Sequence, residues 1–200
     1  MPKILDPSQR RADFVSAIWS VIASEGLSAA TLRRVAAEAD CTTGALTHYF
    51  SDRSALLLEA LRTAHFDAGA RMLGAAGQIT DPMARLEAVL LEALPLDNDR
   101  LTEWLVWLAF WGDSPNEPAF NTENASRYKD WRDLVEVLVQ PFCADEAETQ
   151  AEAALIVAMI DGLGLRLALC AHEPAALEQG RKDCLNSLKR YLNRFSERTI

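Results

Sequence analysis

The sequence lacks any apolar run long enough to cross a lipid bilayer, which takes about 18 residues. Residues 1–7 also lack the apolar centre of a secretory signal peptide. We therefore expect a cytoplasmic protein with no membrane partner. Half of the 200 residues are hydrophobic, which is enough to form a folded core.

Cysteine is scarce, and its spacing argues against a metal site. The four cysteines are Cys41, Cys143, Cys170 and Cys184. They form no CxxC pair and have no set of histidine partners, so the usual spacing of metal ligands is missing. In a reducing compartment we expect thiols with structural roles. No metal or other cofactor is predicted.

Signatures of catalysis are missing as well. The chain contains no glycine-rich phosphate loop. Cys170 and His172 are two residues apart, so they point in different directions on a helix, and no third group would orient the histidine. We therefore do not expect an enzyme.

Basic residues are outnumbered, with 20 Lys and Arg against 29 Asp and Glu and a net charge of −9. The excess acidity is confined to one part of the chain. Residues 1–62 hold seven basic and seven acidic residues, whereas residues 63–200 hold 13 basic and 22 acidic residues. An acidic body would repel DNA and confine any contact with it to the neutral N-terminal segment.

Residues 31–50 predict two short helices joined by a tight turn. Apolar residues recur at helical spacing before the break at Asp40–Cys41, and a second short period resumes after it. The outward face of the second segment consists of small residues, namely Thr42, Thr43, Gly44, Thr47 and His48. A slim face of this kind can approach base edges closely, which favours a DNA-recognition helix over a merely solvated one.

The rest of the chain also predicts helices, so the expected fold class is all-α. An N-terminal helix-turn-helix head, residues 1–62, precedes a larger helical body, residues 63–200. Thr31 is a good N-cap, Gly26 ends the first helix, and Ser51 or Asp52 caps the fourth. Expected helices span about 7–24, 121–139, 145–171 and 174–196, with breaks near Gly74 to Pro82, Pro95 to Asp97 and Gly112 to Pro115.

The head resembles the TetR family of one-component bacterial transcriptional regulators. The resemblance covers residues 10–62 and rests on the order and spacing of Gly26, Thr31, Val35-Ala36, Gly44, Tyr49-Phe50, Arg53 and Leu56-Leu57. The segments 107–111 and 160–166 are similar to the ligand-binding halves of choline-responsive repressors of glycine-betaine synthesis. One position departs from the family: Asp40 occupies a turn position that is usually glycine, although aspartate can adopt the left-handed conformation.

This resemblance implies a set of DNA contacts. Thr42, Thr43, Gly44 and Thr47 match positions facing bases, and Arg33 matches a position near a groove edge. The positions that match phosphate contacts are Thr31, His48, Tyr49 and Arg53. Tyr49 and His48 could instead have structural roles, since the ring of Tyr49 lies on the apolar side of its helix. Arg34 is interpreted as a solvated helix residue.

The body contains a group of aromatic residues that suggests an effector site. Trp104, Trp107 and Trp111 share one helical face and, with Met159 and Leu163, would bound a pocket for a small molecule. An aromatic face can hold a quaternary ammonium compound, particularly beside a carboxylate such as Glu103 or Asp113. Core packing or a subunit contact is the alternative explanation for this tryptophan stripe.

The resemblance also implies a homodimer whose last two helices form a four-helix interface. The predicted interface residues are Ala154, Ala158, Asp161, Gly162, Leu165, Ala168, Leu188, Tyr191 and Leu192. Gly162 and Gly164 could permit close helix approach across the dimer or form a kink lined by effector. A two-fold dimer would place two recognition helices about one DNA turn apart.

The sequence therefore predicts a ligand-responsive regulator that binds an inverted-repeat operator in double-stranded DNA and releases it when a small molecule occupies the body. A constitutive architectural DNA-binding protein would need the same head but no pocket. A change in DNA affinity on adding small molecules separates these two hypotheses. A helical module that binds only proteins is a third alternative, and absence of DNA protection would favour it.

Overall fold

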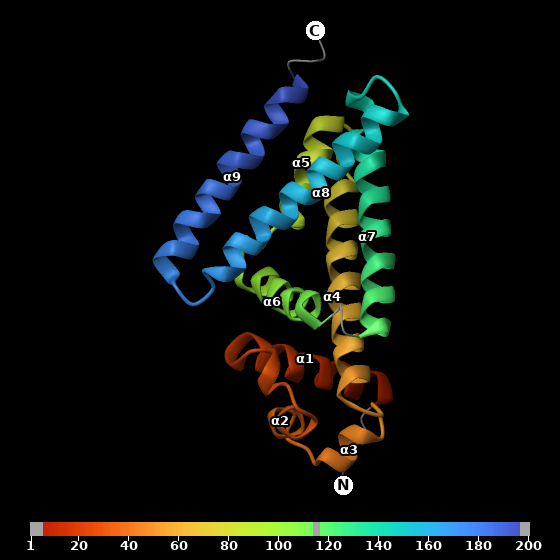
Figure 1. The fold of residues 1–200 in the computed structure, drawn as a ribbon, viewed down its shortest axis with the longest axis vertical. Helices are drawn as coiled ribbons and strands as arrows, with labels where there is room; N and C mark the ends of the chain where they lie inside the picture. The colour runs from red at the N-terminus through yellow and green to blue at the C-terminus, as the bar shows by residue number, and fades with distance from the viewer. Residues whose placement is uncertain (1–5, 114–116, 197–200) are drawn as a thin grey trace. The chain divides into compact units, whose positions relative to one another are not determined.

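The computed structural model describes residues 6–113 and 117–196, which form helices joined by short turns (Figure 1). In chain order the helices are α1 (Pro7–Glu25), η1 (Leu27–Ala29), α2 (Leu32–Glu38), α3 (Thr43–Thr47), α4 (Arg53–Ala76), α5 (Pro82–Glu92), α6 (Asn98–Asp113), α7 (Pro118–Val139), η3 (Gln140–Phe142), α8 (Glu146–Leu169) and α9 (Pro174–Ser196). The all-α prediction is confirmed.

Local capping groups set the helix ends, which is why their positions were predictable. Gly26 follows α1 with a φ of 83°, a left-handed conformation that suits a residue without a side chain. Asp52 rather than Ser51 accepts the hydrogen bond from the backbone N–H of Ala55 (2.8 Å) at the start of α4. Helix α7 begins at Pro118, earlier than predicted, because proline has no N–H to leave unsatisfied in the first turn.

The chain divides into two compact units. The first contains residues 1–66 and 105–120, and the second contains residues 67–104 and 121–200. Helices α4 and α6 each contribute residues to both units. The predicted head thus shares its compact unit with the second half of α6.

A continuous hydrophobic core holds the first unit together. Phe14 and Ile18 of α1, Val35 of α2 and Leu46 of α3 are fully buried in it. Val106 and Phe110 of α6 pack in the same core. Trp19 donates its indole N–H to the backbone carbonyl of Ala60 (3.3 Å), which ties α1 to α4. These contacts fix α2 and α3 on a rigid base.

In the second unit, α8 and α9 run in opposite directions from the turn at residues 170–173 (Figure 1). They pack closely, because a Cβ atom added to Gly180 would lie 2.9 Å from Leu167 Cδ2. Leu188 and Leu192 of α9 face inward and are buried. No helix in the described part of the chain is long and apolar enough to span a membrane.

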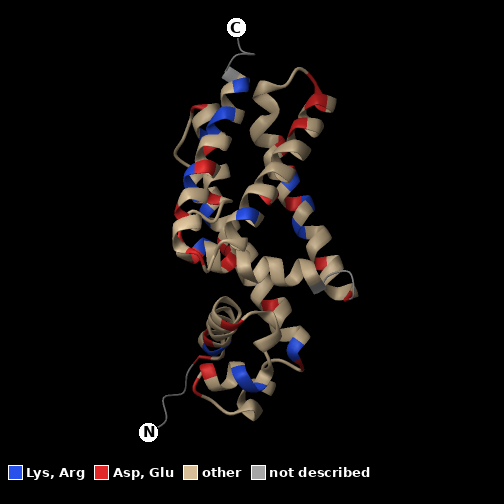
Figure 2. Cartoon of the chain, turned by 60° about the vertical axis from the view of Figure 1, so that its left-hand side comes forward, with Lys and Arg blue, Asp and Glu red and all other residues tan. Residues whose placement is uncertain are grey.

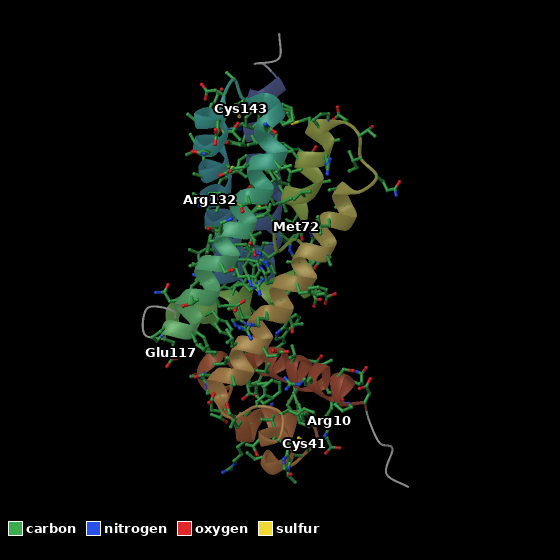
Figure 3. All side chains as sticks on the ribbon, turned by 90° about the vertical axis from the view of Figure 1, so that its right-hand side faces the viewer. Arg10, Cys41, Met72, Glu117, Arg132 and Cys143 are labelled. Carbon is green, nitrogen blue, oxygen red and sulfur yellow. The ribbon has the colours of Figure 1, made fainter. Side chains whose placement is uncertain are left out.

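The labelled cysteines belong to different units (Figure 3). Cys41 lies in the turn between α2 and α3, and Cys143 follows η3 at the end of α7. Cys184 is buried, and this burial raises the pKa of its thiol to about 11. A thiol with a raised pKa is a weak nucleophile at neutral pH, which fits the structural role expected from the sequence.

Candidate DNA interface and effector-binding residues

Helix α2 begins and ends with side-chain and backbone caps that fix the direction of the following turn. The hydroxyl of Thr31 accepts a hydrogen bond from the backbone N–H of Arg34 (3.2 Å). At the other end, the N–H of Cys41 donates to the carbonyl of Ala36 (2.9 Å) and the N–H of Asp40 donates to that of Ala37 (3.3 Å). This is a Schellman motif, and Asp40 occupies its left-handed position with a φ of 48°.

Helix α3 presents the small residues identified in the sequence. Thr42 caps the helix by accepting a hydrogen bond from the N–H of Ala45 (3.1 Å), and Leu46 anchors the helix in the core. The opposite face is solvent-exposed and comprises Thr42, Thr43, Gly44, Thr47 and His48. The predicted outward face is therefore present, and its role in DNA binding remains a prediction.

The residues expected near phosphates differ in their surroundings. Thr31 is exposed, as is Arg33, which was expected near a groove edge. Tyr49 is half-buried, with its ring packed edge-on against Phe14 at 5.3 Å between centroids, so its ring serves the core. Arg34 pairs with Glu25 (2.7 Å) and Glu38 (2.8 Å), which agrees with its interpretation as a helix-surface residue.

Arg53 has a structural role that the sequence did not indicate. Its Nε donates to the backbone carbonyl of Ala30 (2.8 Å) and its Nη2 donates to that of Leu27 (2.9 Å). These bonds join the start of α4 to η1, the turn that precedes α2. Arg53 therefore helps to place the helix-turn-helix, whether or not it also contacts a phosphate.

Acidic and basic residues are interspersed along the helices (Figure 2). Helix α3 has no charged residue, so its exposed face offers hydroxyl, methyl, imidazole and backbone groups only.

Trp104 packs inside the second unit. It is 4% exposed, and its indole N–H donates to the carbonyl of Ala93 (3.0 Å). A Cβ atom on Gly164 would occupy the space of the Trp104 ring. The contact with Trp104 inside the subunit therefore explains why residue 164 is glycine. The sequence analysis had offered close helix approach across a dimer or a kink lined by effector instead. Gly162 is exposed and has no atom within 4 Å of an added Cβ.

The five predicted effector residues are divided between the two compact units, with Trp104, Met159 and Leu163 in the second unit. Trp107 and Trp111 belong to the first unit, where the ring of Trp107 stacks near His65 (6.4 Å between centroids). Met159 and Leu163 are half-buried on α8. They lie on a different face of that helix from Gly164, the position that Trp104 covers.

Tyr128 and Asp161 form a pair that the sequence analysis did not identify. The hydroxyl of Tyr128 on α7 donates to Oδ2 of Asp161 on α8 (3.0 Å). Burial raises the pKa of Asp161, although the hydrogen bond from Tyr128 opposes this shift. Burial and the neighbouring carboxylate raise the pKa of Tyr128. Asp161 is the only charged residue between Leu155 and Leu165, a sequence signal that could have found it.

Asp161 also lies on the same face of α8 as Gly164, because the two are three residues apart. Trp104, Tyr128 and Asp161 therefore border one section of α8 within the second unit. Among the described residues no Lys or Arg forms an ion pair with Asp161. The arrangement combines aromatic rings with a half-buried carboxylate whose charge is not balanced by a cation.

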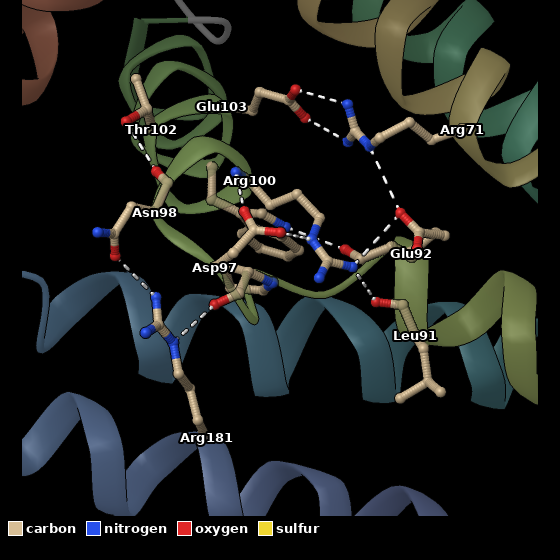
Figure 4. Close-up of polar contacts among 12 residues, drawn as sticks. Arg71, Leu91, Glu92, Asp97, Asn98, Arg100, Thr102, Glu103 and Arg181 are labelled. Atoms are coloured by element: carbon tan, nitrogen blue, oxygen red, sulfur yellow. Dashed lines mark hydrogen bonds and ion pairs between the residues drawn. The ribbon is translucent and has the colours of Figure 1, made fainter.

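Glu103, which the sequence suggested as the partner for a cationic ligand, is already paired. Arg71 donates to both of its oxygens, at 2.7 and 2.6 Å (Figure 4). The same group of side chains includes Glu92 (3.5 Å from Arg71 Nε) and Arg100, which bonds Asp97 (2.8 Å). This network joins α4, α5 and α6. The cations of this network balance the charge of Glu103. The other carboxylate suggested from the sequence, Asp113, has a side chain outside the described part of the structure.

The predicted dimer residues separate into two groups. Ala154, Ala158, Gly162 and Leu165 are exposed along one face of α8. That face also includes Leu155 and Leu169, which are 56% and 73% exposed. The other predicted residues already have partners in the subunit: Ala168, Leu188 and Leu192 are buried, Asp161 accepts from Tyr128, and Tyr191 donates to Glu152 (2.7 Å).

Comparison with known proteins identifies families for both parts of the chain. Residues 14–60 match the family described as bacterial regulatory proteins, tetR family. Residues 82–193 match the family described as BetI-type transcriptional repressor, C-terminal.

Individual relatives agree with these matches. The transcriptional regulator BetI from Burkholderia thailandensis is 36% identical over 84% of this chain and 87% of its own. The regulator PksA from Bacillus subtilis is 30% identical over 84% and 83%. A solved transcriptional regulator from Saccharomonospora viridis, in complex with choline, has the same fold, with a TM-score of 0.78 and 23% identity over 91% of this chain and 96% of that one. These relatives are named as regulators, not as enzymes, as the sequence analysis expected. The chain is a DNA-binding transcriptional regulator that belongs to the tetR family and has a BetI-type C-terminal domain.

Proposed function

We propose that the protein is a repressor that binds an inverted-repeat operator as a homodimer and releases it when a small organic cation binds the body. In this proposal residues 1–62 bind DNA, and residues 63–200 bind the effector and the second subunit. The observation that supports the cationic effector most directly is the half-buried, unbalanced carboxylate of Asp161.

The choice of a cation follows from electrostatics. A carboxylate removed from water without a compensating charge is unfavourable, and a bound cation would restore the lost stabilisation. The pKa of Asp161 is raised by burial, which is the expected sign for a carboxylate without a cationic partner. A single hydrogen bond from Tyr128 compensates for only part of its hydration.

The choice of a quaternary ammonium compound within that class rests on the neighbouring rings. Trp104 and Tyr128 border the same section of α8 as Asp161. Aromatic rings attract alkylated ammonium groups, which have no N–H to donate, through the negative face of the ring. Choline bound to the Saccharomonospora viridis regulator of the same fold is consistent with this class.

The DNA contact is assigned to α3 and its caps. The exposed face lies opposite Leu46, whose burial fixes the rotation of the helix about its axis. Thr42, Thr43, Gly44 and Thr47 would face bases, and Arg33 would lie near a groove edge. The residues that would lie near phosphates are Thr31, His48, Tyr49 and Arg53.

The dimer contact is assigned to the exposed apolar face of α8. Ala154, Ala158, Gly162 and Leu165 follow one another at helical spacing on this face. Leu155 adds to this face beside Ala154 and Ala158, and Leu169 extends it beyond Leu165. A second copy of the same face would bury these side chains and give the two-fold symmetry that an inverted repeat requires.

A titration of operator binding against choline tests the effector proposal. Wild-type protein bound to its operator duplex should be released as choline is added, and Asp161→Asn should bind the same duplex but require at least about tenfold more choline, because a charged contact has been lost. Glu178→Gln is the matched control, since it removes an exposed carboxylate on α9 and should respond like wild type.

The other outcomes separate the alternatives. Release by neutral apolar compounds alone would reject the cationic effector but keep the regulated repressor. Operator binding that no small molecule changes would favour a constitutive architectural protein.

A further inference from the structure

The three threonines of the α3 face differ in the hydrogen bonds that their hydroxyl groups already make. Thr47 Oγ1 donates to the backbone carbonyl of Gly44 (3.0 Å). Thr42 Oγ1 accepts from the backbone N–H of Ala45 (3.1 Å). The hydroxyl of Thr43 has no hydrogen bond among the described residues. The three side chains therefore offer different groups to an incoming base edge.

The bond to Gly44 limits what Thr47 can do. Its hydroxyl proton is used within the helix, so its oxygen can only accept a hydrogen bond from a base. The major-groove donors are the amino groups of adenine and cytosine. Because Oγ1 is directed back along the helix, the methyl group takes another staggered position on Cβ. Thr47 is exposed, so this methyl group is available for an apolar contact.

Thr42 has the opposite polarity. Its oxygen already accepts a backbone N–H, while its own proton is not used by that bond. It can donate to a phosphate or to an acceptor on a base edge. The cap therefore supplies a donor at the start of α3, and Thr47 supplies an acceptor one turn later.

The same face has none of the side chains that recognise guanine or adenine through two hydrogen bonds. Two-point recognition of guanine needs Arg or Lys, and two-point recognition of adenine needs Asn or Gln. None of these residues occurs among Thr42, Thr43, Gly44, Thr47 and His48. The apolar groups on this face are threonine methyl groups, and the apolar group that a base presents in the major groove is the C5-methyl of thymine.

We propose that α3 selects its half-site mainly through thymine C5-methyl groups, with Thr47 providing a methyl contact and accepting from an adjacent adenine amino group. This proposal rests on the proposed role of α3 in DNA binding. It makes Thr47 the residue that determines specificity by an apolar contact, rather than by two hydrogen bonds to the same base. The preferred half-site would contain, opposite Thr47, a thymine with an adenine next to it.

Replacing thymine with deoxyuridine tests the proposal, because deoxyuridine lacks only the methyl group. The operator would first be selected from a randomised duplex library with the full-length protein. Each thymine of the selected duplex would then be replaced in turn, and the dissociation constants measured at fixed salt. At least one replacement per half-site should weaken wild-type binding by about fourfold, the effect of burying one methyl group.

Two variants of Thr47 separate its methyl group from its hydroxyl. Thr47→Ser removes the methyl group, and should bind the thymine and deoxyuridine duplexes equally well at the sensitive position. Thr47→Val keeps a methyl group, and should retain the thymine preference while losing the preference for adenine beside it. Thr80→Ser, at an exposed threonine between α4 and α5, is the matched control and should behave like wild type.

The results that would overturn the proposal are distinct from failure of the proposed function. If no duplex is enriched in the selection, the operator-binding function itself is wrong. If a duplex is enriched but every deoxyuridine replacement changes binding by less than about twofold, methyl recognition is wrong. If Thr47→Ser keeps the full thymine preference, the methyl contact belongs to another residue. Thermal unfolding of each variant would establish that it is folded.

Discussion

Tyr128 donates a hydrogen bond to Asp161 across the α7–α8 packing, at 3.0 Å. The pair places a charged group in an otherwise apolar section of α8, and burial raises the pKa of that group above its ordinary value of 3.8. A carboxyl group whose native pKa is raised lowers the free energy of unfolding at neutral pH.

We therefore expect Asp161→Asn to stabilise the ligand-free protein at neutral pH. Asparagine keeps an oxygen that can accept from Tyr128 but has no charge to desolvate. A carboxyl group with a raised native pKa costs no stability below pH 3.8. The cost grows as the pH rises toward the native pKa and is complete above it. Urea unfolding of both proteins should thus show a larger gain for Asp161→Asn at neutral pH than near pH 3.8.

A gain of equal size at both pH values would show that ionisation of Asp161 is not the cause. Glu178→Gln, on the exposed surface of α9, should change the unfolding free energy little at either pH.

The contact between Trp104 and Gly164 predicts opposite effects for two neighbouring glycines. Gly164→Ala would place a Cβ atom within the Trp104 ring, so we expect a loss of about 1–3 kcal/mol, as for overpacking of a filled core. Gly162→Ala meets no atom within 4 Å, so its better helix propensity should add up to about 1 kcal/mol. Chemical denaturation measures both changes. Equal effects of the two substitutions would contradict this account of Gly164.

Arg53 and Arg33 were both expected to contact DNA, but they should differ in their effect on stability. Arg53→Ala removes two hydrogen bonds to the backbone carbonyls of Leu27 and Ala30, and should cost about 2–3 kcal/mol. Arg33 is exposed, so Arg33→Ala should leave stability nearly unchanged and weaken DNA binding without regard to sequence.

Unfolding curves and salt-dependent binding to operator and scrambled duplexes distinguish these two roles. Unchanged stability of Arg53→Ala would refute its structural role, and unchanged binding by Arg33→Ala to both duplexes would refute its predicted position near the groove edge.

The parts of this protein that sequence reasoning identified are those encoded by neighbouring residues. Thr31 and Asp52 cap helices through bonds to backbone groups a few residues away, so their positions marked the helix starts correctly. Asp40 stands at a turn position that is usually glycine in the family, and its φ of 48° lies in the left-handed region that aspartate can adopt.

The contacts that sequence reasoning missed join residues far apart in the chain. Nothing local to Tyr128 indicates that it reaches Asp161. Arg53 bonds to backbone carbonyls, which leave no mark in the side-chain pattern. Gly164 suggested close packing, but the partner, Trp104, comes from α6 rather than from a second subunit.

The exposed face of α8 predicts that Gly162→Trp disrupts dimerisation without unfolding the subunit. No atom lies within 4 Å of a Cβ added at Gly162, so a bulky side chain can be accommodated in the isolated subunit. In a dimer built on this face, the same side chain would separate the two copies of α8. Light scattering at several protein concentrations should then report a monomer or a much weaker dimer, and operator binding should weaken because each half-site would be bound independently. Glu178→Trp adds the same bulk to the polar outer face of α9 and should remain dimeric. A folded Gly162→Trp protein that stays fully dimeric would place the interface on another surface, and loss of the dimer in Glu178→Trp alone would place it on the outer face of α9.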